Sequence, residues 1–307
     1  MSRTAKLRIV LCSPASYKVG FSGATIPLLY TLFSQEGIEC DLAFLDTAPY
    51  SLIEKRKLSE FDIVAFTVQY EWEYVNIARM LMSSGIKATK PRRKPIVVGG
   101  GPCITSNPEP LADILDVAVI GDAEVTVPKL CEAVSEGVSG IDSLAGKEGF
   151  YFFRERARRA IADEIASTMI PTIAAKNVDV TVYGRAARVE AVRGCPMLCR
   201  YCLIGWTARP YREKPIERVL SEVKGQLDDL NSRKAVFIGA GLTFYSRLED
   251  LCRQVKALGV EGSIASIRPE FVSGEKLKAI RARGGDPLVI VYPGKTAVEL
   301  VREGRGY

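Results

Sequence analysis

The sequence of 307 residues contains no histidine. This absence excludes Ser-His-Asp and Cys-His catalysis, zinc or haem sites held by imidazole, and any histidine general base. The sequence also lacks an apolar run approaching the roughly 20 residues that span a membrane. The first residues have no signal-peptide pattern, because the apolar stretch at 7–12 is too short and predicts a strand. We therefore expect a cytoplasmic protein with no membrane partner.

A strong charge imbalance is lacking too, since 42 Lys and Arg stand against 36 Asp and Glu, a net charge of +6. Basic residues form only modest clusters, at 90–94, 154–159 and 209–214. A nucleic-acid surface would need a denser basic stripe or interleaved aromatic residues. A solvated basic face is the simpler interpretation, so nucleic acid is not an expected partner.

Cysteine, in contrast, is present eight times. In a cytosolic protein, spaced cysteines indicate metal binding or catalysis rather than disulfides. Three of them share the segment R-G-C-P-M-L-C-R-Y-C at 193–202, with the spacing C-x3-C-x2-C: Cys195, Cys199 and Cys202. One tight loop with this spacing can supply thiolates to three irons of a cubane cluster. The fourth iron then stays open, as a substrate-binding metal centre requires.

Two other interpretations of these cysteines remain. They could simply pack in a loop, or they could hold zinc. A zinc site would need a fourth ligand, and without histidine the nearest candidate is Cys252, far along the chain. The cysteines outside the motif lie within or beside predicted core elements and are interpreted as ordinary buried residues: Cys12, Cys40, Cys103, Cys131 and Cys252.

Residues 1–140 alternate β-rich apolar runs with helical patterns. Strands are predicted at 7–12, 39–45, 63–67, 95–98 and 117–120, and helices at 25–35, 71–83, 108–115 and 124–135. This alternation is typical of a doubly wound parallel α/β sheet of the flavodoxin or Rossmann type. Ligands of such sheets bind at the carboxyl ends of the strands.

Residues 141–187 form a connecting segment in this interpretation, with a hairpin expected at 150–161. A second βα series occupies 188–307. Its strands are predicted at 189–192, 235–238, 263–266 and 288–291, and its helices at 216–229, 245–258, 273–282 and 296–302. About four βα units cannot close an eight-stranded barrel, so we expect an incomplete, partial barrel. Its open edge would need a cover.

The cysteine loop, with Tyr201 before its last cysteine, resembles the signature of the radical S-adenosylmethionine superfamily. The resemblance implies a [4Fe-4S] cluster whose open iron chelates the amino and carboxylate groups of S-adenosylmethionine. It implies reductive cleavage of that cofactor to a 5′-deoxyadenosyl radical, with electrons from a reductant such as a ferredoxin or flavodoxin. It also implies that the loop follows the first barrel strand and that Tyr201 lies near the adenine.

The same resemblance indicates further contacts to S-adenosylmethionine. Where the superfamily often carries a G-G-E-like stretch, this chain has Gly239, Ala240 and Gly241. The glycines would let the backbone approach the ligand closely, but the acidic residue is missing. Ser266 and Arg268 are the other candidate contacts, although Arg268 suits a capping or salt-bridge role equally well.

The N-terminal region resembles the cobalamin-binding-type domain that precedes many radical S-adenosylmethionine cores, in a subgroup of uncharacterised proteins. The resemblance rests on Y-K-V-G-F-S at 17–22, T-V-Q-Y-E at 67–71, V-G-G-G-P at 98–102, N-P-E-P-L-A at 107–112 and G-D-A-E at 121–124. Glycines at strand ends let backbone N–H groups face a phosphate, or simply allow a sharp turn. The candidate cobalamin contacts are Tyr17, Thr67, Gln69, Gly99, Gly100 and Gly101.

Because histidine is absent, any bound cobalamin must lack a histidine ligand. Its cobalt could be five-coordinate, carry water or be capped by Tyr17; alternatively, the domain keeps the fold without binding cobalamin. With cobalamin, methyl transfer to an unactivated carbon is the expected chemistry. The substrate is not indicated by the sequence.

Three functions follow from these patterns. The first is a radical enzyme, working alone or as half of a split enzyme whose partner chain completes the barrel, since only 105 residues (307 − 202) follow Cys202. The second is a non-catalytic assembly subunit that holds a cluster or cobalamin. The third, a methylthiotransferase, shares the domain order. It needs three patterned cysteines in the first domain and a C-terminal RNA-binding β-barrel, neither of which the sequence indicates.

Overall fold

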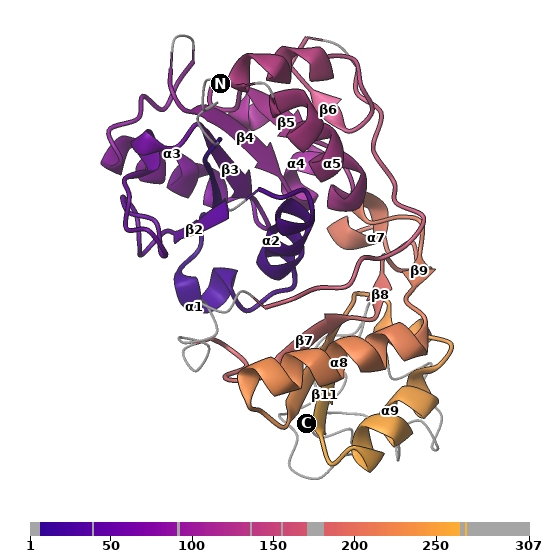
Figure 1. Cartoon of the computed structure of the whole chain (residues 1–307). Helices are drawn as coiled ribbons and strands as arrows, with labels where there is room; N and C mark the ends of the chain where they lie inside the picture. The colour runs from indigo at the N-terminus through magenta and orange to yellow at the C-terminus, as the bar shows by residue number, and fades with distance from the viewer. Residues whose placement is uncertain are drawn as a thin grey trace, which may run out of the picture.

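The computed structural model describes residues 7–38, 40–90, 93–135, 137–154, 156–170, 181–264 and 268. It shows two α/β units, a larger N-terminal one and a smaller C-terminal one (Figure 1). The elements predicted at 273–282, 288–291 and 296–302 lie outside the described residues, as does Ser266. None of the helices in the described ranges is long and apolar enough to cross a membrane.

The first unit is built on a six-stranded sheet in the order β2-β1-β3-β4-β5-β6. Its strands are β1 (Ile9–Ser13), β2 (Cys40–Phe44), β3 (Ile63–Thr67), β4 (Ile96–Gly100), β5 (Val117–Val119) and β6 (Phe150–Tyr151). The first five are parallel, and β6 runs antiparallel to β5. The order 2-1-3-4-5 is that of a doubly wound sheet, so this prediction is confirmed.

Helices cover both faces of this sheet, which is why every residue of β1 and β2 is buried. On one face, α2 (Thr25–Gln35) and α5 (Ala123–Val134) share a core with Ile9 and Leu11. On the other, α3 (Glu73–Ser83) and α4 (Pro102–Ser106) share a core with Val10. The remaining short turns are α1 (Tyr17–Gly20), η1 (Leu58–Glu60), η2 (Glu109–Leu111) and η3 (Val138–Leu144).

Two sequence predictions for this unit are wrong. The helix expected at 108–115 is replaced by the short 3-10 turn η2, because Pro108 and Pro110 lack the N–H groups that a regular helix needs. In the described part of 150–161 no second strand pairs with β6 as the expected hairpin requires; β6 pairs with β5 instead, through Phe150 and Val119. That pairing buries Phe150 in the core, which a free hairpin would not do.

The second unit contains the parallel strands β11 (Glu261–Ile264), β10 (Lys234–Ile238) and β7 (Ala187–Glu190), in that order. Helices α8 (Ile216–Leu230) and α9 (Leu248–Ala257) pack on this sheet, and η5 (Leu242–Phe244) follows β10. The predicted strand at 189–192 is divided between β7 and a short strand, β8 (Val192–Arg193). The predicted βα series is therefore present as far as residue 264, and its interpretation as a partial barrel stays a prediction.

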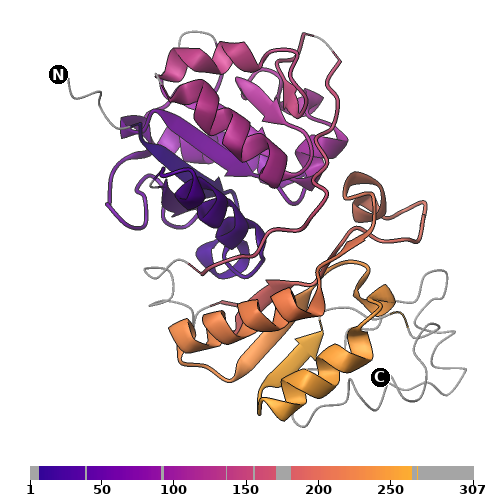
Figure 2. The same ribbon diagram turned by 45° about the vertical axis from the view of Figure 1, so that its right-hand side comes forward.

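Strand β8 pairs antiparallel with β9 (Arg212–Glu213). The cysteine motif and α7 (Leu203–Thr207) lie in the loop between these two strands. In Figure 2 this loop extends from the second unit toward the first, beside the segment that connects the two units. Contacts between α4 and α7 place the loop against the carboxyl end of the first sheet.

Candidate cofactor site

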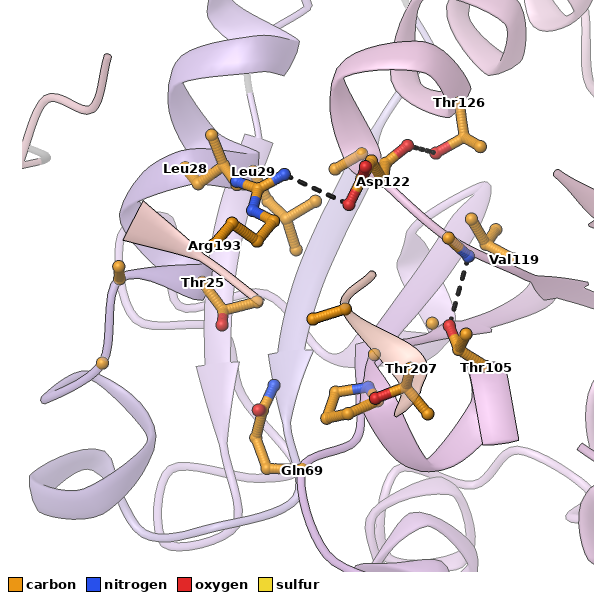
Figure 3. Close-up of a pocket in the computed structure, with 18 of the residues that line it drawn as sticks. Thr25, Leu28, Leu29, Gln69, Thr105, Val119, Asp122, Thr126, Arg193 and Thr207 are labelled. Atoms are coloured by element: carbon orange, nitrogen blue, oxygen red, sulfur yellow. Dashed lines mark hydrogen bonds and ion pairs between the residues drawn. The ribbon is translucent and has the colours of Figure 1, made fainter. Parts of the chain in front are cut away.

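A cavity of 460 Å³ lies where the carboxyl ends of the first sheet meet the second unit. Its size is within the range of small-molecule sites. The inner part is apolar and lies between the sheet and helices α2 and α5, with Leu11, Val98, Leu29 and Leu130 in its walls. The walls also carry polar side chains, among them Gln69, Thr105, Asp122 and Arg193 (Figure 3).

This cavity brings together parts of both predicted cofactor sites. Gln69, Gly100 and Gly101, from the predicted cobalamin set, line it, and so do Gly239 and Ala240 from the predicted S-adenosylmethionine set. Thr67 is linked to it indirectly, because its hydroxyl accepts a hydrogen bond from Nε2 of Gln69 at 3.1 Å. Among the described residues, the predicted cobalamin and S-adenosylmethionine contacts that are not in its walls are Tyr17, Thr67, Gly99, Tyr201, Gly241 and Arg268.

The glycine run at the end of β4 serves more than one purpose. Gly101 has a φ of +107°, and a Cβ there would lie 2.4 Å from the carbonyl oxygen of Val68, so the turn itself requires glycine. A Cβ at Gly99 would lie 2.5 Å from Leu115. Gly100 differs, because its nearest neighbour, Val119, would be at an ordinary 3.5 Å. Close packing in the protein explains Gly99 and Gly101, whereas Gly100 faces the cavity.

Tyr17 lies in the core of the first unit. Its ring stacks on Phe21 at 5.4 Å and meets the edge of Phe44 at 5.0 Å. Burial raises the pKa of Tyr17 to about 12, although nearby Arg188 opposes the shift. This position gives no support to the interpretation that Tyr17 caps cobalt.

The three motif cysteines are partly exposed and form no disulfide. Their loop turns tightly, with the amide of Cys202 donating to the carbonyl of Cys199 at 3.1 Å. Burial raises the pKa of Cys195, and charge on Cys202 and Cys199 raises it further, so the thiols are near enough to influence one another. Three free thiols in one loop are the donor set of an iron–sulfur cluster.

Over the described ranges, no group of three Cys, Asp or Glu side chains could hold a single metal ion. A cubane cluster does not need such a convergence, because each thiolate binds a different iron. The structure gives no support to zinc binding with Cys252 as the fourth ligand. Cys252 packs against the core of the second unit, and burial raises its pKa to about 11.

Other predicted S-adenosylmethionine contacts surround this loop. A guanidinium nitrogen of Arg268 lies 3.6 Å from Sγ of Cys199, and its backbone amide donates to Oγ1 of Thr243 at 2.9 Å. The Tyr201 side chain is 68% exposed. A Cβ at Gly239 would lie 2.6 Å from the carbonyl oxygen of Val192. The turn at 239–241 therefore packs against the base of the cysteine loop.

Three cysteines of the first unit, Cys12, Cys40 and Cys103, do not come together as a second site. Cys12 and Cys103 lie in the core on one face of the sheet, and Cys40 lies in the core on the opposite face. Burial raises the pKa of each thiol, that of Cys103 to about 11. The position of Cys40 across the sheet separates it from the other two.

An ion network joins the two units beside the cavity, and sequence reasoning missed it. Nη1 of Arg193 lies 3.2 Å from Oδ1 of Asp122 and 2.8 Å from Oε2 of Glu124, and Nη2 lies 2.7 Å from Glu190. Nη1 of Arg212 lies 2.6 Å from Oδ2 of Asp122. The signal was available, because Asp122, Glu124 and Arg193 all lie in segments on which the family resemblance rests.

The network favours the charged forms of Asp122 and Arg193. Burial raises the pKa of Asp122, but the hydrogen bond from Arg212 and the charge of Arg193 lower it by more. The pKa of Asp122 therefore lies below the ordinary 3.8. Burial alone would lower the pKa of Arg193, and the charges of Glu190 and Glu124 outweigh that effect and raise it. The charge-assisted bonds to Asp122 and Glu124 cross the boundary between the units.

The fold and the cavity define an α/β protein with a three-cysteine loop at the end of a parallel sheet. The family model for the N-terminal part of radical SAM proteins matches residues 33–146. An uncharacterised protein of Methanocaldococcus jannaschii, MJ0966, is 22% identical over 90% of this chain and 58% of its own length. A putative methylthiotransferase of the same organism, MJ0865, is 23% identical over 90% of this chain and 59% of its own length.

Among solved structures, the chain is similar to TsrM of Kitasatospora setae, a radical S-adenosylmethionine methyltransferase with cobalamin and a [4Fe-4S] cluster bound. The TM-score is 0.67 at 16% identity, over 93% of this chain and 61% of TsrM. Together these findings show that the chain is similar to radical S-adenosylmethionine proteins in sequence over its N-terminal part and in fold over most of its length. The chain spans about three fifths of the length of these relatives.

Proposed function

We propose that the chain cleaves S-adenosylmethionine reductively and uses a cobalamin without a histidine ligand for methyl transfer. The observation that carries this proposal is the single cavity shared by Gly100 and Gly101 of the first unit and Gly239 and Ala240 of the second. When bound, a [4Fe-4S] cluster would supply the electron for cleavage and cobalamin would carry the methyl group.

Cys195, Cys199 and Cys202 would hold the cluster, and the turn at 239–241 would lie beside the methionyl part of S-adenosylmethionine. In the first unit, the apolar inner cavity between the sheet, α2 and α5 suits a flat aromatic base. The N-terminus of α5, at Asp122 and Ala123, is also in the cavity wall. With Tyr17 in the core, no described side chain is assigned as the lower cobalt ligand, in keeping with a five-coordinate or water-bound cobalt.

The relatives are longer than this chain, and we propose that further βα units, from additional sequence or a partner chain, complete the barrel around the substrate. A small acidic electron carrier, such as a ferredoxin or flavodoxin, would be the reductant. A substrate is not assigned, because the described residues do not include a complete barrel.

Anaerobic reconstitution tests the proposal. The protein should retain about four irons per chain and release 5′-deoxyadenosine when S-adenosylmethionine and a reductant are added. Cys202→Ser should lose both properties, and the matched control Cys252→Ser should keep both. A protein that holds iron equally well in both variants would contradict the assigned ligands.

Cobalamin binding is tested separately. After incubation with hydroxocobalamin and gel filtration, the chain should retain the corrinoid. The electron paramagnetic resonance spectrum of the cobalt(II) form should lack nitrogen splitting from an axial imidazole. Retention of cluster and corrinoid without any 5′-deoxyadenosine, even with the partner chain added, would favour the second candidate, an assembly subunit.

A further inference from the structure

The cysteine loop is fastened at its C-terminal end by an arginine from the connecting segment. Nη1 of Arg159 donates to the carbonyl oxygens of Trp206 at 3.1 Å and Thr207 at 2.9 Å, and Nη2 donates to that of Arg209 at 2.6 Å. These carbonyls end α7, which begins directly after Cys202. Carbonyls at a helix end have no partner within the helix, and a cation there is favourable.

Arg159 is itself anchored on the first unit. The next residue, Ala160, donates its amide to Ile120 at 3.0 Å and accepts the amide of Asp122 at 3.0 Å. The contact is close, because a Cβ at Gly121 would lie 2.1 Å from the carbonyl oxygen of Ala160. The segment that carries Arg159 is therefore fixed to the turn between β5 and α5, and Gly121 and Asp122 of that turn line the cavity.

The N-terminal end of the loop is fastened to the same turn. Arg193, two residues before Cys195, pairs with Asp122 and Glu124, as described above. The amide of Ala162 also donates to Oδ2 of Asp122 at 2.9 Å. The loop is thus held at both ends by guanidinium groups that converge on residues 120–124.

We infer that Arg159 and Arg193 are positioning residues that couple the cysteine loop to the occupancy of the first-unit cavity. A ligand in the cavity contacts the turn at 120–124, and this turn holds both ends of the loop. Binding in the cavity should therefore order the cysteines, and by thermodynamic reciprocity the ordered loop should strengthen binding in the cavity. This inference rests on the proposed function for the identity of the ligand, a corrinoid.

The test uses the full chain without a cluster and measures alkylation of each thiol by iodoacetamide, resolved by peptide mass spectrometry. Hydroxocobalamin should slow the alkylation of Cys199 and Cys202 in the wild type. Arg159→Gln should speed their alkylation about tenfold, as expected when charge-assisted hydrogen bonds to a loop are lost, and should weaken the effect of hydroxocobalamin. Arg159→Lys should restore part of the protection, since it keeps the charge.

The matched control is Arg158→Gln, a change at the exposed neighbouring arginine, and alkylation of Cys252 reports general unfolding. Wild-type rates in Arg159→Gln, or wild-type rates that hydroxocobalamin does not change, would overturn the inference. A rise at Cys252 equal to that at Cys199 would overturn it too, because the arginine would then stabilise the whole unit. If Arg159→Gln retains iron and its alkylation rates are unchanged, this inference alone is refuted. If the wild type does not hold iron, the proposed function is refuted.

Discussion

Gly241 lies directly against the first cysteine of the motif, and a Cβ at Gly241 would be 3.2 Å from the Cα of Cys195. It would also be 2.8 Å from the carbonyl oxygen of Gly194 and 2.9 Å from the ring of Tyr211. Two of these three neighbours are backbone atoms, which cannot move aside as a flexible side chain could. The turn after β10 therefore fixes the position of the cysteine loop at Gly194 and Cys195.

Gly241→Ala should consequently push Gly194 and Cys195 outward and weaken cluster assembly. We expect iron retention after anaerobic reconstitution and gel filtration to fall at least severalfold, with the fold kept. The control is Gly225→Ala in α8, where a Cβ would meet nothing within 4 Å. That variant should be more stable by about 1 kcal/mol, because alanine favours a helix over glycine, and its iron retention should be unchanged. Full iron retention in Gly241→Ala would contradict this account.

The ion network predicts a dependence of stability on pH. The pKa of Asp122 is lower in the folded protein than its ordinary 3.8. Its contribution to stability is therefore complete above that ordinary value and is lost as the pH falls through the folded pKa. Asp122→Asn should lower the free energy of unfolding at pH 7 by about 2 kcal/mol, and the difference from the wild type should shrink below pH 4. Urea unfolding across this pH range measures it.

Asp250→Asn provides a matched control for that experiment. Asp250 pairs with Arg247 and Arg253 on the surface, and such exposed pairs contribute little. Its effect should stay below about 1 kcal/mol at every pH. If the two variants lose the same free energy of unfolding, or if the loss in Asp122→Asn does not depend on pH, the ion network does not stabilise the fold as stated here.

The sequence predicted the elements whose patterns are local. Helix α2 and strand β3 have the predicted bounds, because their apolar residues follow a helical and a strand period and Thr25 and Gln35 delimit the helix. The prediction failed at 108–115. The apolar spacing of Leu111, Ile114 and Leu115 indicated a helix, but two prolines prevent one in the structure. It also failed at β6, because Phe150 of β6 pairs with Val119 of β5 far earlier in the chain, a separation over which periodicity gives no information.

In the candidate site, too, the features encoded by a local pattern were predicted and those that depend on distant contacts were not. The spacing of the three cysteines is local and was visible at once. The roles of Arg159 and Arg193 depend on contacts with carbonyls 47 residues away and carboxylates 69 residues away, which no local pattern encodes. Tyr17 was chosen because its loop resembles a cobalamin loop, but its side chain packs between Phe21 and Phe44, as an aromatic residue beside a buried strand often does.

Arg188 is the least satisfied charge among the described residues. Its side chain is buried at the boundary of the two units, with Nε and Nη2 lacking a hydrogen-bond partner in the described structure. Its Nη1 donates to the carbonyl of Phe21, and the guanidinium lies 4.7 Å from the centre of the Phe21 ring. Burial lowers the pKa of Arg188 from 12.5 to about 10.

Arg188→Met should therefore leave the free energy of unfolding unchanged or raise it, because it removes a buried charge that has no carboxylate partner among the described residues. The charged form opposes folding at every pH below about 10, so the advantage of the variant should be the same at pH 7 and pH 9. Chemical denaturation at these two values measures it. A loss of more than about 2 kcal/mol would mean that the contacts with Phe21 outweigh the cost of burying the charge.

A larger side chain at Ala65, on the central strand β3, can fill part of the cavity. Ala65 on β3 lines it and is only partly buried, so a larger side chain at this position has space to enter. Ala65→Leu should reduce the apolar inner volume without disturbing the core, and the melting temperature of the ligand-free protein should stay the same or rise. The same variant should lose affinity for hydroxocobalamin at least tenfold in equilibrium dialysis, while iron retention by the cysteine loop is kept. A folded Ala65→Leu protein that binds the corrinoid as the wild type does would show that the inner cavity is not the corrinoid site.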